Sequence, residues 1–123
     1  MSGIKTILAD TNFIIYMLEG RKETIPFLDN FIVLSVITEM ELLGIKNIPA
    51  KVYTTRKSVL DDSLILPFDE KIKDIAITLK QKHSIKIPDS IIAATAIKYG
   101  IPLISADKAL AKISNLDLIL LQL

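Results

Sequence analysis

Residues 7–12, Ile-Leu-Ala-Asp-Thr-Asn, join a short apolar run to polar residues that can begin a helix. The apolar run predicts a buried strand that ends at Asp10. A second acid, Asp107, follows another mainly apolar run, and Asp89 precedes the apolar, helix-like run 91–97. In a parallel α/β sheet the carboxyl ends of neighbouring strands converge, and ligands bind just outside them. The sequence therefore predicts that these three acids lie together at one edge of a sheet.

Strand-like and helix-like segments alternate along the whole chain. Short apolar runs predict strands at residues 4–9, 31–35, 64–66, 103–105 and 118–121. Helical periodicity, with proline and glycine at the ends, predicts helices at residues 11–18, 23–29, 36–44, 49–61, 70–82, 88–100 and 108–113. This alternation predicts an α/β protein with three α/β/α layers, a Rossmann-like fold around a central parallel sheet of about five strands.

Length and composition limit the class of protein. A chain of 123 residues, half of them apolar, is expected to form one domain over residues 1–123 with a substantial core. The absence of cysteine excludes disulfides, thiolate metal sites and cysteine nucleophiles. No apolar run approaches the roughly 18 residues that a membrane span needs, and the N-terminus leads directly into the first predicted strand. We therefore expect a cytoplasmic protein without a signal peptide or a membrane partner.

The net charge of +1, from 15 basic and 14 acidic residues, does not by itself indicate a nucleic-acid binder. If the three aspartates and one glutamate point into a single pocket, the rest of the chain carries 15 basic and 10 acidic residues, a net charge of +5. A basic rim around an acidic hollow would suit a polyanionic substrate held by a metal ion. Ordinary mixed surface charge explains the composition equally well.

Each aspartate also has a structural interpretation. Asp10, followed by Thr11 and Asn12, can cap the start of a helix. Asp107 can cap the helix that follows it, and Asp89 lies in a first helical turn, where the helix dipole favours a negative charge. Clustered carboxylates, however, repel one another and are tolerated mainly when a cation neutralises them. Because hard divalent cations choose oxygen ligands, the coincidence of three acids at predicted strand ends favours a metal site.

A fourth acid is available in the segment 36–44, which contains both Glu39 and Glu41. On a helix these two residues lie about 200° apart, so they cannot share one target. Each is about 100° from Met40, the middle of the apolar face, so helical periodicity does not choose between them.

Four segments resemble, in order, the successive motifs of PIN domains, and in particular those of the VapC-type toxins of prokaryotic toxin–antitoxin modules. The segments are Asp10-Thr11-Asn12, residues 38–44, residues 88–96 and Ser105-Ala106-Asp107. No single motif is specific to this family. All four motifs together, in this order and over nearly the whole chain, are specific to it. An aromatic residue often found shortly after the fourth motif is absent, and Leu110 is the residue available for its packing role.

The resemblance implies a function and a set of site residues. In that family four acids bind Mg²⁺ or Mn²⁺, and the domain acts as an endoribonuclease on RNA. Motif by motif, the catalytic and metal-binding acids correspond to Asp10, Glu41, Asp89 and Asp107, which selects Glu41 over the neighbouring glutamate. Two supporting polar positions correspond to Asn12 and Ser105. The resemblance also implies a homodimer and a cognate antitoxin protein as partners.

Three other functions compete with this interpretation. A two-component receiver domain would need paired acids after the first strand and a lysine after a late strand, but Asp10 stands alone and Asp107 occupies the late position. A haloacid-dehalogenase-like phosphatase would need a second acid where the chain has Asn12. A non-catalytic PIN-like module that binds RNA or protein could keep all four acids, and it stays open as the alternative.

Overall fold

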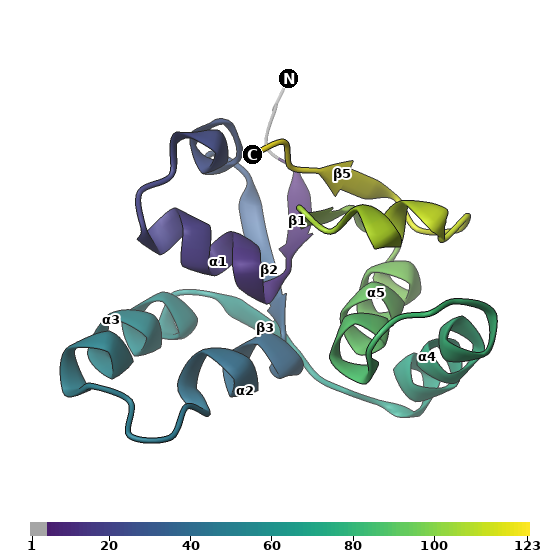
Figure 1. The fold of residues 1–123 in the computed structure, drawn as a ribbon, viewed down its shortest axis with the longest axis horizontal. Helices are drawn as coiled ribbons and strands as arrows, with labels where there is room; N and C mark the ends of the chain where they lie inside the picture. The colour runs from purple at the N-terminus through teal and green to yellow at the C-terminus, as the bar shows by residue number, and fades with distance from the viewer. Residues whose placement is uncertain (1–4) are drawn as a thin grey trace.

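The computed structural model describes residues 5–123 and contains, in that range, a five-stranded sheet. The strand order is β3-β2-β1-β4-β5, with β1 at the centre (Figure 1). The strands are β1 Thr6–Ala9, β2 Phe31–Ser35, β3 Leu64–Leu66, β4 Leu103–Ser105 and β5 Leu118–Leu120. Every neighbouring pair is parallel, which confirms the predicted fold class.

Helices lie between the strands at nearly the predicted positions. The α-helices are α1 Thr11–Leu18, α2 Val36–Leu43, α3 Ala50–Asp61, α4 Glu70–Lys82 and α5 Ile87–Tyr99. The two short helices, η1 Lys22–Phe27 and η2 Lys108–Lys112, are 3₁₀-helices. In η1, Pro26 has no amide hydrogen to give to an α-helical bond. The predicted first strand began at Ile4, which lies outside the described residues, and the last strand ends one residue earlier than predicted.

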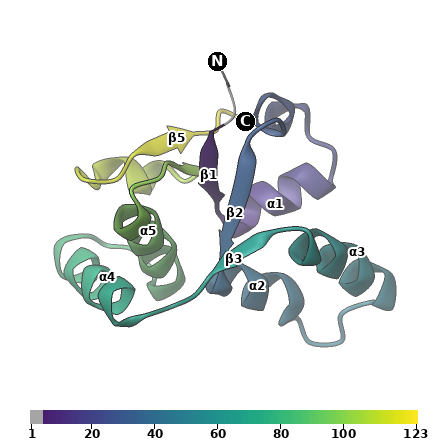
Figure 2. The same ribbon diagram turned by 180° about the vertical axis from the view of Figure 1, so that it is seen from behind.

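The helices cover both faces of the sheet (Figures 1 and 2). Side chains alternate along each strand, so Ile7 and Ala9 of β1 point to one face and Leu8 points to the other. Leu8 packs with apolar residues of α4, α5 and η2, whereas Ile7 and Ala9 pack with apolar residues of α1, α2 and α3. Burial on both faces explains why the inner strands are continuous apolar runs. Within residues 5–123, no helix combines the length and the apolar composition needed to cross a membrane.

The carboxyl ends of β1, β2 and β4 form one edge, because these strands are neighbours in a parallel sheet. A helix begins directly after each of them. The side chains of the cap residues Asp10, Ser35 and Asp107 each accept a hydrogen bond from a backbone amide in the first turn, at 2.8, 3.0 and 3.0 Å. Helix α5 runs back toward β4 and ends at Gly100, whose left-handed φ of 64° turns the chain. The first turn of α5, with Asp89, therefore starts at this same edge.

Candidate active site

Asp10 lies at the centre of the candidate site because β1 is the central strand. The pairing of Ala9 with Ile104 brings the end of β1 beside the end of β4, and the Asp10 amide donates to the Ile104 carbonyl at 3.2 Å. The buried Ser105 hydroxyl hydrogen-bonds to the Asp10 carboxylate and accepts from the Asp107 amide at 3.0 Å. Ser105 therefore links Asp10 to the Asp107 turn across the two strand ends.

The environment of Asp10 disfavours its negative charge and raises the pKa of the carboxyl above its usual value. Burial is the largest cause, and the nearby charges of Asp89 and Asp107 raise the pKa further. Hydrogen bonds from Ser105 and from the Phe13 amide act in the opposite direction but do not cancel the effect. The carboxylate is thus oriented by hydrogen bonds while its charge remains unfavourable.

Asp89, in the first turn of α5, has the same kind of perturbation. Its pKa is raised first by burial and then by the charges of Asp107 and Glu41, while Lys86 acts in the opposite direction. The dipole of α5 favours a carboxylate at this position, so burial and repulsion oppose the dipole interaction predicted from the sequence. Asp89 therefore lies within electrostatic reach of acids from three other segments of the chain.

The structure separates the two glutamates of α2. The exposed carboxylate of Glu41 accepts a hydrogen bond from the Thr11 hydroxyl at 2.5 Å and lies close enough to Asp89 to raise its pKa. Glu39 lies toward α3 instead. The pKa of the Lys57 amine is raised mainly by its hydrogen bond to Asp61, with a smaller contribution from Glu39. Glu41 thus belongs to the acidic edge by position, and Glu39 does not.

Asp107 is exposed and caps η2, as its structural interpretation predicted, and its charge also acts on both Asp10 and Asp89. The fold therefore brings Asp89 close to each of the other three predicted acids, and Asp107 close to Asp10 as well. In the described part of the chain, the lysines and arginines that form ion pairs bind other acids, and none is paired with these four. Among these described residues, no ion pair with a side chain compensates the negative charge of the cluster.

A hollow of about 120 Å³ opens between these elements. Its lining consists of Asp10, Thr11, Asn12, Glu41, Asp89 and Ile92. At roughly 30 Å³ for each water in the liquid, this volume suits a cation that keeps some of its water shell. Asp107 lies outside the lining, and the exposed side chain of Asn12 stands within it.

The donor atoms around the hollow fit a hard divalent cation only in part. As the side chains lie, residues 5–123 contain no group of three or more acidic, histidine or cysteine residues arranged to hold one ion. Mg²⁺, however, is commonly bound through one or two carboxylates and keeps several waters. The lining acids supply only oxygen ligands, and a cation would offset the burial and the repulsion that together raise the pKa values of Asp10 and Asp89. The chemistry of the donor set fits, with Asp10 and Asp89 as the pair that most needs a cation.

Sequence reasoning missed two residues of this edge, Thr11 and Thr38. The Thr11 hydroxyl contacts both Glu41 and the Thr38 hydroxyl, at 2.5 and 3.1 Å. In the sequence, Thr11 stands among the cap residues after Asp10 and Thr38 begins the second motif segment, and neither position alone indicates the contact. The spacing of Thr38 three residues before Glu41 puts both on one helical face, which was the available indication.

Comparisons with protein families and with solved structures agree with the fold described above. The family model of the PIN domain matches residues 7–116. The fold resembles a chain of a toxin–antitoxin complex from Klebsiella pneumoniae, with a TM-score of 0.78 and 29% identity over 92% of this chain and 95% of that one. It also resembles a chain of VapBC-1 from nontypeable Haemophilus influenzae, with a TM-score of 0.75 and 26% identity over 94% and 97% of the two chains.

A third structure, VapBC2 from Rickettsia felis bound to a DNA fragment from its promoter, matches with a TM-score of 0.79. Its identity is 23%, over 95% of this chain and 99% of that one, so it supports the fold alone. No curated protein matches the chain. The family model covers far more than half of the sequence and includes all four predicted acids. The chain belongs to the PIN domain family.

Proposed function

We propose that the chain is a VapC-type toxin, a single nuclease domain over residues 1–123 that cleaves RNA phosphodiester bonds with bound Mg²⁺ or Mn²⁺. The observation that best supports this is the cluster of acids at the carboxyl ends of the strands, with raised pKa values at Asp10 and Asp89 and, within residues 5–123, no ion pair to balance them. Stability alone gives no reason to collect like charges in a partly buried hollow.

The side chains of the site have distinct roles in this proposal. Asp10 and Asp89 bind the cation directly, while Glu41 and Asp107 bind it either directly or through a water molecule. Ser105 fixes the Asp10 carboxylate by a hydrogen bond. The side-chain amide of Asn12, at the hollow, has two N–H donors that can bond a phosphate oxygen. When bound, the ion would lower the pKa of a water and offset negative charge on the phosphate and the leaving oxygen.

Two exposed lysines border the acidic edge and could contact the RNA backbone. Lys86 precedes the first residue of α5, three residues before Asp89, and is close enough to lower the pKa of Asp89, against the larger effects that raise it. Lys108 follows Asp107 directly and is exposed. We expect each to hold a phosphate near the hollow, since a polyanion approaching an acidic cluster needs cations at its rim.

A cleavage assay on purified protein tests the proposal. Wild type with Mg²⁺ or Mn²⁺ should cleave RNA, and Asp10→Asn and Asp89→Asn should abolish cleavage while circular dichroism stays native-like. Asp29→Asn, which changes an exposed acid away from the hollow, is the matched control and should cleave normally. If wild type binds RNA as tightly as Asp89→Asn and neither cleaves, the chain is a non-catalytic RNA-binding module instead.

We further propose a cognate antitoxin as a protein partner, because the solved structures that the chain resembles at 29% and 26% identity are described as a toxin–antitoxin complex and as VapBC-1. A small protein encoded beside this chain should co-purify with it and inhibit its cleavage of RNA. A neighbouring product that neither binds nor inhibits would leave a solitary nuclease.

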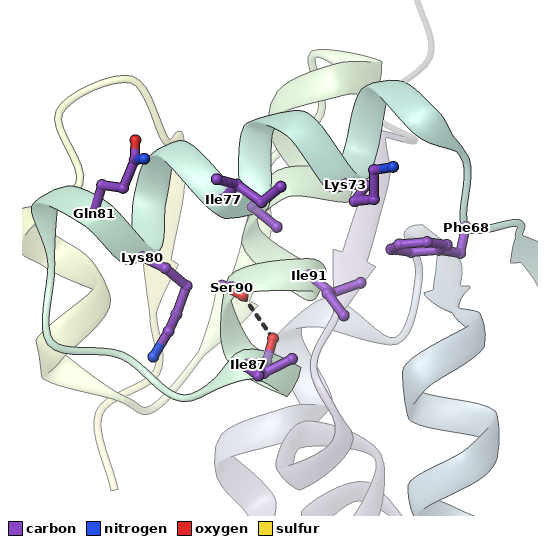
Figure 3. A pocket seen from close by; sticks show the side chains of 9 residues that line it. Phe68, Lys73, Ile77, Lys80, Gln81, Ile87, Ser90 and Ile91 are labelled. Atoms are coloured by element: carbon purple, nitrogen blue, oxygen red, sulfur yellow. Dashed lines mark hydrogen bonds between the residues drawn. The ribbon is translucent and has the colours of Figure 1, made fainter.

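A second copy of the chain is the other partner we propose, and an apolar groove between α4 and α5 supports it. Figure 3 shows Phe68, Ile77, Ile87 and Ile91 around this groove, which has a volume of about 430 Å³. The first three are 45%, 49% and 64% exposed, which is unusual for large apolar side chains gathered at one place. The Ser90 hydroxyl donates to the Ile87 carbonyl at 2.6 Å, so it adds no free polar group to the groove.

The groove suits a two-fold symmetric contact because one surface supplies both protrusions and a depression. Small side chains, Ala76 and Ser90, line the groove together with the exposed Phe68 and Ile77. In a two-fold interface the same patch meets itself, so each copy needs both features. Lys73 at the groove is neutralised by Glu70 at 2.7 Å, which lowers the repulsion between copies.

Light scattering at micromolar concentration tests the dimer. Ile77→Glu should convert a wild-type dimer into a monomer, whereas Ile25→Glu, at a 61% exposed isoleucine in η1, should leave it dimeric. A monomeric wild type, or equal effects of the two substitutions, would contradict this interface.

A further inference from the structure

Three side chains join α1 to α2 beside the acidic hollow. Thr11 is the first residue of α1, and its hydroxyl oxygen lies 3.1 Å from the Thr38 hydroxyl and 2.5 Å from a Glu41 carboxylate oxygen. Thr38 and Glu41 are three residues apart on α2, so they share one face of that helix. The two helices therefore meet through a short line of polar atoms that ends at the carboxylate.

The order of donors in this line follows from the number of protons. A threonine hydroxyl has one proton to give, and the charged carboxylate is both the nearer and the stronger acceptor. Thr11 therefore donates to Glu41 and accepts from Thr38. Thr38 is 0% exposed, so its hydroxyl depends on a partner within the protein, and Thr11 supplies one.

Without this hydrogen bond to Thr11, packing would not restrict the Glu41 side chain. Glu41 is exposed and has several rotatable bonds, and it sits near the end of an eight-residue helix. With this hydrogen bond, the carboxylate is held at the rim of the hollow, close enough to Asp89 to raise its pKa.

We propose that Thr11 is a positioning residue that holds Glu41 beside Asp89, ready to act on a bound cation. The inference rests on the proposed metal-dependent function and assigns Thr11 a role in it. Thr11 acts through Glu41 and is not itself a ligand in this account. Loss of its hydroxyl should therefore weaken metal binding without removing any acid.

Isothermal titration of the purified full chain with Mn²⁺ alone tests the role. Thr11→Val, which keeps the side-chain shape and removes the hydroxyl, should weaken Mn²⁺ binding about tenfold, the usual order for a lost partner of a metal ligand. Thr11→Ser restores the hydroxyl and should bind Mn²⁺ like wild type. Thr95→Val is the matched control, because it removes a buried hydroxyl bond to the Ile91 carbonyl, at 2.7 Å within α5, that touches none of the acids.

The outcomes separate this inference from the proposed function. If wild type binds Mn²⁺ and Thr11→Val binds it equally well, the positioning role is wrong and the metal site stands. If Thr11→Ser is as weak as Thr11→Val, or Thr95→Val is weakened equally, the effect is one of general stability and the role is again wrong. If wild type does not bind Mn²⁺, both proposals fail together. Melting curves in EDTA show whether each variant is folded.

Discussion

Replacing Asp89 by asparagine should stabilise the metal-free protein while destroying its metal response. The pKa of Asp89 is raised in the folded state by burial and by the charges of Asp107 and Glu41. A carboxyl group of this kind destabilises the fold once it is ionised: the penalty starts as pH rises past the unfolded pKa and is complete above the folded one. At neutral pH the neutral amide escapes this penalty, so Asp89→Asn should melt higher than wild type in EDTA.

The stabilisation of wild type by Mn²⁺ depends on the metal concentration relative to its dissociation constant. At a hundredfold excess over its dissociation constant, Mn²⁺ should stabilise wild type by about 2.7 kcal/mol. A chain of 123 residues has an unfolding entropy of roughly 0.26 kcal/mol per kelvin, so the melting temperature should rise by about 10 °C. In Asp89→Asn the rise should shrink sharply, since one of the two central carboxylates is gone.

Four melting curves test the predicted stabilisation in EDTA and the predicted loss of the Mn²⁺ response. They are those of wild type and Asp89→Asn, each measured with EDTA and with Mn²⁺. Asp29→Asn, with its exposed acid in a loop, is the control for a lost negative charge and should respond to Mn²⁺ like wild type. Equal metal shifts in wild type and Asp89→Asn would refute the reasoning, because Asp89 would then be only a helix-capping acid. A lower melting temperature of Asp89→Asn in EDTA would mean that the helix dipole outweighs the burial and repulsion that disfavour the Asp89 charge.

The remaining predictions follow from single contacts. Glu41→Gln should lose RNA cleavage and most of the Mn²⁺ melting shift, whereas Glu39→Gln, which lies toward Lys57, should keep both; the reverse result would assign the wrong glutamate to the site. In urea titrations of the metal-free protein, the stability advantage of Asp89→Asn should fade as pH drops through the folded pKa of Asp89 and be gone below the unfolded pKa; an advantage that persists in acid would have another origin. Gly100→Ala should cost about 1–2 kcal/mol by urea unfolding, since φ is 64° and a Cβ there meets no atom within 4 Å, so only backbone strain acts; an unchanged midpoint would contradict that strain.

Strand and helix positions could be predicted well because the inner strands are buried on both faces. Ile7, Leu8 and Ala9 pack into two different cores, so they form an apolar run that sequence alone makes visible. Parallel topology then places Asp10 beside Ser105 by register, as the alternation of strands and helices implied. The short helices were harder to predict in type, because a few residues with Pro26 among them do not distinguish α from 3₁₀ geometry.

The arrangement of the acidic edge was less predictable. Helical periodicity left Glu39 and Glu41 equivalent, because it describes faces of an isolated helix and not the neighbour that each face meets. The choice depends on how α2 packs against α1 and α3, which brings Thr11 to Glu41 and Lys57 near Glu39. The same packing creates the contact between Thr11 and Thr38, which no spacing along the chain encodes.

The central claim is that the acids at the strand ends share one cation, and an anomalous difference map from crystals grown with Mn²⁺ tests it most directly. We predict a manganese peak in the hollow lined by Asp10 and Asp89, bound by at least one oxygen of each. No peak at these residues, or a peak held only by acids elsewhere such as Asp61 and Asp62, would contradict the account.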